Sequence, residues 1–178
     1  MEIILAENHG FCYGVKRAVE MADEAANSDG KSYTLGPIIH NPQVVGRLES
    51  KGVSPIQEVA DIDEGTMIIR SHGVGPAIYA EAEEKGLHIL DATCPHVKKA
   101  QQDAKSVIED GMTLVILGEK NHPEVKSINL WANNKGIIIE DEESAEKLQI
   151  VEKMGVVVQT TFSQFKFNSI IEILEKKS

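Results

Sequence analysis

Short runs of hydrophobic residues recur along the chain, and glycine, asparagine or aspartate stands next to most of them. Each run has three or four apolar residues with little polar alternation, which is typical of strands covered on both faces of a sheet. Six runs are predicted to be strands, and a seventh, shorter one covers residues 33–35. The six are residues 3–5, 67–69, 87–90, 114–117, 137–139 and 156–158.

Stretches with helical spacing separate these runs. Residues 15–26 are rich in alanine and contain no helix breaker, and residues 77–85 also combine alanine with glutamate. In residues 97–109, Val97, Ala100 and Ala104 fall on one stripe, as expected of an amphipathic helix. Ile170 and Leu174 repeat at helical spacing near the end of the chain. Strand and helix therefore alternate, which predicts an α/β fold with mostly parallel sheets and right-handed crossovers.

The chain also contains an internal repeat. Cys12 precedes Val-Lys-Arg-Ala at 15–18, and Cys94, 82 residues later, precedes Val-Lys-Lys-Ala at 97–100. The same offset relates the Leu-Gly pairs at 35–36 and 117–118, and relates His40 to His122. A duplication that copies its reactive residues predicts two similar small α/β units around one shared site. We expect a first unit over residues 1–92 and a second over 93–178.

Composition narrows the classes of function. The net charge of −10 argues against non-specific binding to nucleic acid, which needs basic patches. No apolar run approaches the roughly 20 residues of a membrane span, so we expect no membrane partner. Two cysteines without a secretion signal predict a cytoplasmic protein with free or metal-bound thiols.

Polar residues of catalytic type follow the predicted strands. Because the carboxyl ends of parallel strands meet at one edge of a sheet, such residues should gather there. Pro95 favours the first helical position, so the preceding cysteine is predicted to be a helix N-cap, where the thiolate is favoured. The candidates are Cys12, His40, His72, Cys94, His122, Glu124 and Thr160.

Several chemistries remain open on these residues alone. A disulfide oxidoreductase would normally carry Cys-x-x-Cys, which is absent. A zinc site of two cysteines and two histidines and a Cys–His hydrolase are conceivable, although neither fits the duplicated cysteine well. An iron–sulfur cluster fits better, because single thiolates from separate loops can ligate one cluster. The plain alternatives are two buried structural cysteines and, for Glu124, an exposed acid at a helix start.

Six motifs in order resemble the 4-hydroxy-3-methylbut-2-enyl diphosphate reductases of the non-mevalonate isoprenoid pathway. The first is Gly-Phe-Cys-Tyr-Gly-Val-Lys-Arg-Ala-Val at 10–19, and the fourth is Asp-Ala-Thr-Cys-Pro at 91–95. The others are Gly-Pro-Ile-Ile-His-Asn-Pro at 36–42, Arg-Ser-His-Gly-Val at 70–74, His-Pro-Glu-Val at 122–125 and Gln-Thr-Thr at 159–161. They run the whole length of the chain, so the resemblance is specific.

The resemblance implies a fold, a cofactor and a reaction. The fold would be two blades of a three-bladed assembly around a central cavity. Cys12 and Cys94 would be two of three cysteines that hold a [4Fe–4S] cluster. His40, His72 and His122 would bind the diphosphate, and Glu124 would relay a proton to the substrate hydroxyl with Thr160 beside it. The reaction would be a reductive dehydroxylation to isopentenyl and dimethylallyl diphosphate, with ferredoxin or flavodoxin as electron donor.

The sequence departs from the family in two ways. It lacks the third repeat, which carries the third cysteine and a Ser-x-Asn motif, and Ser127 stands where the family usually has glycine. We therefore expect the amino-terminal two repeats of a reductase, whose exposed third face would favour a homodimer. The alternatives are a non-enzymatic module that binds a metal or a diphosphate, and an unrelated α/β enzyme. Continuation of the reading frame past Ser178 would separate the first two.

Overall fold

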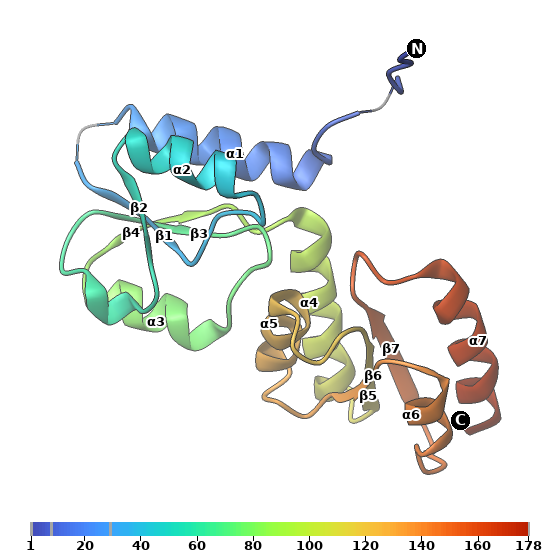
Figure 1. The fold of residues 1–178 in the computed structure, drawn as a ribbon. Helices are drawn as coiled ribbons and strands as arrows, with labels where there is room; N and C mark the ends of the chain where they lie inside the picture. Colours follow the sequence, from blue (N-terminus) through green and yellow to red (C-terminus); the bar gives the residue numbers. More distant parts are fainter. Residues whose placement is uncertain (1, 8, 29, 178) are drawn as a thin grey trace.

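Two parallel sheets lie side by side, with helices on both faces of each (Figure 1). The computed structural model describes residues 2–7, 9–28 and 30–177. The α/β fold with parallel sheets is confirmed, since every strand pair in these ranges is parallel. No helix in the same ranges is long and apolar enough to cross a membrane.

The first sheet has four strands in the order β2-β1-β3-β4. Helices α1 and α2 cover one face, and α3 with the short helix η1 covers the other. Side chains of β3 alternate accordingly, because Ile68 packs under α1 and α2 whereas Met67 and Ile69 pack toward α3. The elements are α1 (Tyr13–Ala26), β1 (Ser32–Leu35), α2 (Pro42–Ser50), β2 (Val53–Ile56), η1 (Val59–Asp61), β3 (Thr66–Ile69), α3 (Pro76–Glu84) and β4 (His88–Asp91).

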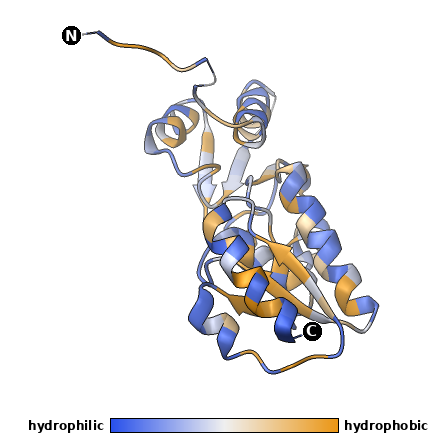
Figure 2. Cartoon of the chain, turned by 90° about the vertical axis from the view of Figure 1, so that its right-hand side faces the viewer, coloured by the Kyte–Doolittle hydropathy of each residue, from blue (hydrophilic) through white to orange (hydrophobic). Residues whose placement is uncertain are grey.

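The second sheet has three strands in the order β6-β5-β7, which is the order of the first three strands of the first sheet. Helices α4 and α5 cover one face, and α6 with α7 covers the other. The strands are the most hydrophobic part of this half and are enclosed by helices with polar outer faces (Figure 2). The elements are α4 (Pro95–Glu109), β5 (Thr113–Leu117), α5 (Pro123–Trp131), β6 (Ile137–Ile139), α6 (Glu142–Glu146), β7 (Met154–Val158), α7 (Gln164–Leu174) and η2 (Glu175–Lys177).

Most of the predicted elements are present, and one predicted strand is wrong. Residues 3–5 form no strand, and their side chains are exposed (74–83% for Ile3, Ile4 and Leu5). The segment extends away from both sheets (Figure 2), so no described strand offers its edge for pairing. A β-rich composition alone does not make a strand, because a strand needs a hydrogen-bonding neighbour.

Proline marks the start of four helices that begin at the carboxyl end of a strand or in the loop after it. Pro42, Pro76, Pro95 and Pro123 are the first residues of α2, α3, α4 and α5. The fixed φ of proline suits the first helical position, where its missing N–H is not needed. The residues just before these prolines are therefore helix N-caps, and they include Cys94 and His122.

Candidate functional site

Three histidines meet between the two sheets. His40 and His72 follow β1 and β3 of the first sheet, and His122 follows β5 of the second. The ring centroids of His40 and His72 lie 4.9 Å apart, and those of His72 and His122 lie 5.3 Å apart. The structure thus brings together the three histidines that the sequence singled out. His72 is the central ring and contacts the other two.

The environment of His72 disfavours the charged imidazolium. Burial, followed by the neighbouring His40, His122 and Arg70, lowers the pKa of His72 from 6.5 to about 4. The ring is therefore neutral at neutral pH. Its Nδ1 is buried and has no hydrogen-bond partner among the described residues. An unpaired buried nitrogen is costly in a folded protein, which marks this ring as a place for a ligand or a water molecule.

A buried carboxylate lies beside the histidine cluster. Glu124 is only 2% exposed, although it occupies the second position of α5. Its Oε1 accepts a hydrogen bond from the backbone N–H of Thr160 at 2.6 Å, and its Oε2 accepts one from the Thr160 hydroxyl at 2.8 Å. The alternative of an exposed acid at a helix start is therefore wrong. Thr160 thus supplies a hydrogen-bond partner to each oxygen of this buried side chain.

His122 connects the carboxylate to the histidines. As N-cap of α5, its Nδ1 accepts a hydrogen bond from the backbone N–H of Glu124 at 3.2 Å. This bond leaves Nε2 of His122 as the ring nitrogen that carries the proton in the neutral form. One short turn thus places an imidazole and a carboxylate two residues apart in one site.

The two cysteines lie at the ends of equivalent helices. Cys12 is the N-cap of α1 and Cys94 is the N-cap of α4, and neither side chain makes a capping hydrogen bond. A Cβ placed on Gly14, in the first turn of α1, would lie 2.5 Å from Sγ of Cys94. Both thiols are free, and Cys12 is exposed while Cys94 is half-buried. The alternative of two buried structural cysteines is therefore wrong.

Side chains that the sequence analysis did not single out hold the Cys94 loop. Arg17 donates hydrogen bonds to the carbonyls of Thr93 and Asp91, at 3.2 and 3.4 Å. Lys98 forms an ion pair with the carboxylate of Asp91 at 2.6 Å. The repeated Val-Lys-[Arg/Lys]-Ala motif after each cysteine was the available signal, since it places these cations one turn into each helix.

The cysteines fit part of a metal or cluster site. They provide two free thiols at helix N-termini. Within the described ranges, no group of three or more His, Cys, Asp or Glu residues could hold a metal ion. A zinc site of two cysteines and two histidines is therefore not formed. The residues present suit two ligand positions of a [4Fe–4S] cluster and supply no third.

Comparison with known proteins identifies a family. The family model described as LytB protein matches residues 3–178. The curated 4-hydroxy-3-methylbut-2-enyl diphosphate reductase of Pelobacter propionicus is 50% identical over 178 residues, which are 99% of this chain and 63% of the relative. The reductase of Geotalea uraniireducens is 48% identical over 172 residues, 97% of this chain and 61% of the relative. The chain thus spans less than two thirds of these relatives.

Two solved structures share the fold. The E-1-hydroxy-2-methyl-but-2-enyl-4-diphosphate reductase from Plasmodium falciparum superposes with a TM-score of 0.90 at 31% identity, over 96% of this chain and 55% of the other. A structure of (E)-4-hydroxy-3-methyl-but-2-enyl diphosphate reductase superposes with a TM-score of 0.83 at 44% identity, over 97% of this chain and 63% of the other.

Proposed function

Because this chain belongs to the LytB protein family, we propose that it carries part of the active site of a 4-hydroxy-3-methylbut-2-enyl diphosphate reductase. The observation that carries the proposal is the contact of three histidine rings beside a buried carboxylate. A diphosphate needs several hydrogen-bond donors, and a proton-consuming reaction needs a held proton. The three histidines would supply the hydrogen-bond donors, and the carboxyl group of Glu124 would hold the proton.

The histidines would bind the diphosphate. A neutral imidazole donates one hydrogen bond, and an imidazolium donates two and adds a positive charge. Burial and positive neighbours lower the pKa of His72, and the negative charge of a bound diphosphate would favour the imidazolium and so raise this pKa. Binding would therefore draw a proton onto His72. The buried Nδ1, which lacks a partner in the described part of the chain, would gain one.

The Glu124–Thr160 pair would handle a proton. Glu124 is buried, and the Thr160 hydroxyl that bonds to it is on an exposed residue. A proton could pass from the carboxyl group through this hydroxyl to the leaving hydroxyl of a substrate, which departs as water. The net reaction consumes two electrons and two protons. One proton leaves in the water, and the other is added to carbon.

Cys12 and Cys94 would hold two ligand positions of a [4Fe–4S] cluster. When bound, such a cluster supplies electrons and a Lewis-acidic iron. The electrons would come from a small redox protein such as ferredoxin or flavodoxin. Free thiols of this kind also suit a reducing, cytoplasmic compartment. We place the division between the two repeats at residues 92 and 93, between the end of β4 and the start of α4.

A chimaera tests the proposal. The matching 63% of the Pelobacter propionicus reductase is replaced by this chain, and turnover is measured anaerobically after cluster reconstitution. We expect turnover, and we expect Glu124→Gln in the chimaera to slow it while diphosphate affinity is retained. Lys99→Gln, on the exposed side of α4, is the matched control. A folded chimaera that binds its cluster and substrate but does not turn over would favour the non-enzymatic binding module instead.

A further inference from the structure

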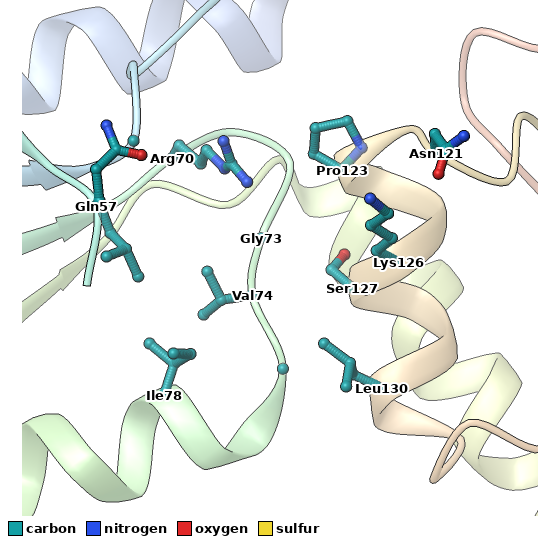
Figure 3. Close-up of a pocket in the computed structure, with 13 residues that line it drawn as sticks. Gln57, Arg70, Gly73, Val74, Ile78, Asn121, Pro123, Lys126, Ser127 and Leu130 are labelled. Carbon is teal, nitrogen blue, oxygen red and sulfur yellow. The ribbon is translucent and has the colours of Figure 1, made fainter. Parts of the chain in front are cut away.

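The β3–α3 loop lines a second cavity in addition to the one at the histidine site. Ser71 and His72 line a cavity of about 240 Å³ with His40, whereas the flanking Arg70 and Gly73 line one of about 310 Å³. The larger cavity lies between this loop and α5 (Figure 3). No histidine and no cysteine lines it. Its lining thus shares no residue with the histidine cavity.

Two cations line this cavity, and no acid does. Arg70 reaches it from the β3–α3 loop and Lys126 from α5, and Figure 3 shows both charged groups at the same end. The chain has 28 acidic and 18 basic residues, so a cavity wall with two bases and no acid runs against its overall composition. Neither cation takes part in an ion pair within the described ranges.

Arg70 forms no ion pair with a described acidic residue. Its Nε is buried and makes no hydrogen bond with any described residue. Its guanidinium packs on Gly36, where a Cβ would lie 2.8 Å from one terminal nitrogen, so a side chain at this position would displace it. Burial holds the pKa of Arg70 below its usual value, although arginine stays charged at neutral pH. A half-buried cation with a buried, unpaired Nε and no counter-charge is unfavourable, and an anion would relieve it.

The other end of the cavity is apolar. Val74, Ile78 and Leu130 lie there, away from the two cations (Figure 3). Two positive charges match the two negative charges of a phosphate monoester better than the single charge of a monocarboxylate. The apolar end would take a short hydrocarbon chain.

We propose that this cavity binds a small phosphate monoester with a short apolar chain, its phosphate between Arg70 and Lys126. The guanidinium would form paired hydrogen bonds to two phosphate oxygens, and the flexible ammonium would form a single charge-assisted bond. Asn121 and Gln57 add amide groups to the rim. The site is additional to the proposed diphosphate site at the histidines, and it does not depend on that assignment.

Calorimetric titration of the 178-residue chain with 3-methylbutyl phosphate tests the proposal. We expect saturable binding that is tighter than that of inorganic phosphate, because the tail buries apolar surface, and tighter than that of 3-methylbutanoate. Lys126→Gln should weaken binding about tenfold, which corresponds to the loss of one charge-assisted hydrogen bond. Lys126 is exposed, so this variant should fold normally even if Arg70→Gln does not.

A control variant tests whether the effect is specific. Lys99→Gln, on the exposed side of α4, removes a positive charge away from the cavity and should leave binding of 3-methylbutyl phosphate unchanged. The proposal is overturned if Lys126→Gln binds like the unaltered chain, or if no saturation is reached in the millimolar range. Equal affinity for 3-methylbutanoate would overturn the preference for phosphate.

Discussion

Thr160 donates two hydrogen bonds to the carboxylate of Glu124, one from its backbone N–H to Oε1 at 2.6 Å and one from its hydroxyl to Oε2 at 2.8 Å. The two residues are 36 positions apart, at the start of α5 and after the end of β7. The pair therefore joins two loops at the carboxyl edge of the second sheet. It also satisfies both oxygens of a side chain that is almost fully buried.

These two hydrogen bonds predict how substitutions of Glu124 affect stability. In Glu124→Gln the amide oxygen can still accept from the Thr160 N–H, and the amide N–H can donate to the Thr160 hydroxyl. We expect the free energy of unfolding to change by about 1 kcal/mol at most. Glu124→Ala leaves a void and an unpaired N–H, and we expect a loss of about 2–4 kcal/mol. Urea denaturation of the 178-residue chain measures both values.

Thr160→Val provides the matched control for the pair, because it removes the hydroxyl and keeps the backbone N–H. We expect it to lower the free energy of unfolding by about 1 kcal/mol. Combined with Glu124→Ala, its effect should be smaller than alone, since the partner is already gone. Strict additivity in this cycle would show that the side-chain bond contributes nothing to stability.

The low pKa of His72 predicts a pH dependence of stability. Because the folded-state pKa is about 4 and the ordinary value is 6.5, the unfolded chain binds more protons between these two pH values. The contribution of His72 to stability is thus complete above pH 6.5 and is lost as the pH falls toward 4. We expect His72→Asn to flatten this part of the stability profile, measured by denaturation between pH 4 and 7.

Inorganic pyrophosphate should change the titration of His72. If the dianion binds at the histidines, the imidazolium becomes favourable and the pKa of His72 rises. Proton NMR titration of the ring, with and without pyrophosphate, measures this shift. Lys126→Gln is the control, since Lys126 lines the other cavity and its loss should leave the shift in place. An unchanged His72 titration at saturating pyrophosphate would contradict the proposed diphosphate site.

Gly14 and Gly46 form a matched pair of helical glycines. A Cβ on Gly14 would lie 2.5 Å from Sγ of Cys94, whereas a Cβ on Gly46 in α2 meets nothing within 4 Å. We expect Gly14→Ala to destabilise the chain by about 1–3 kcal/mol through overpacking. Gly46→Ala should stabilise it by about 0.5–1 kcal/mol, because alanine is the better helix former. Thermal unfolding measures both, and the rate of thiol alkylation reports any displacement of Cys94.

Ser127 bridges the two halves of the molecule. Its hydroxyl lies 2.8 Å from the carbonyl oxygens of His72 and Glu124, and it accepts a hydrogen bond from the amide of Gln101 at 3.2 Å. One hydroxyl hydrogen can bond to only one of the two carbonyls at a time. We expect Ser127→Ala to cost about 1–2 kcal/mol, because the buried amide of Gln101 loses its acceptor. Urea denaturation with an unchanged midpoint would contradict this role.

The number of cysteines predicts the cluster content of the 178-residue chain. Two thiolates are fewer than the three that we expect a [4Fe–4S] cluster to need, and one of them is exposed. We expect no intact cluster after purification in air and no reductase activity. Anaerobic reconstitution with iron and sulfide, followed by Mössbauer spectroscopy and a turnover assay, measures both. A stoichiometric four-iron cluster with activity in the monomer would contradict this prediction.

The sequence predicted those strands well whose residues are hydrophobic because both faces of the strand are buried. Strands β3 and β5 are short apolar runs covered on both faces, so their pattern is unambiguous. Strand β2 was missed because it contains Pro55 and lies at the edge of its sheet, where proline is tolerated. Helices α2 and α5 were also missed, because they contain no alanine, whereas the equally short α3, which also starts at a proline, was recognised by its alanine content.

The histidine cluster followed from the rule that ligands gather at the carboxyl ends of parallel strands. The rule could not show that Glu124 is buried, because its burial depends on Thr160, which is distant in sequence. The sequence identified Ser127 as a departure from the family and Arg70 as part of a motif, but it could not show their contacts, since these cross the boundary between the two halves. The hydrophobic pattern of the sequence predicts each strand and the loop that follows it. Contacts between loops that are distant in sequence are visible only in the three-dimensional structure.

The separation of the hydrophobic cores has a consequence for unfolding. Four apolar clusters fill the described part of the molecule, and none of them contains buried residues from both sheets. The halves meet instead through local contacts, such as the bond from the Trp131 indole N–H to the carbonyl of Val74 at 2.9 Å and the edge-on contact of the Trp131 and Tyr79 rings. Such contacts transmit little cooperativity, so the halves should open in separate steps of hydrogen exchange. An anion held by His72 and His122 would fasten the two halves together and merge those steps.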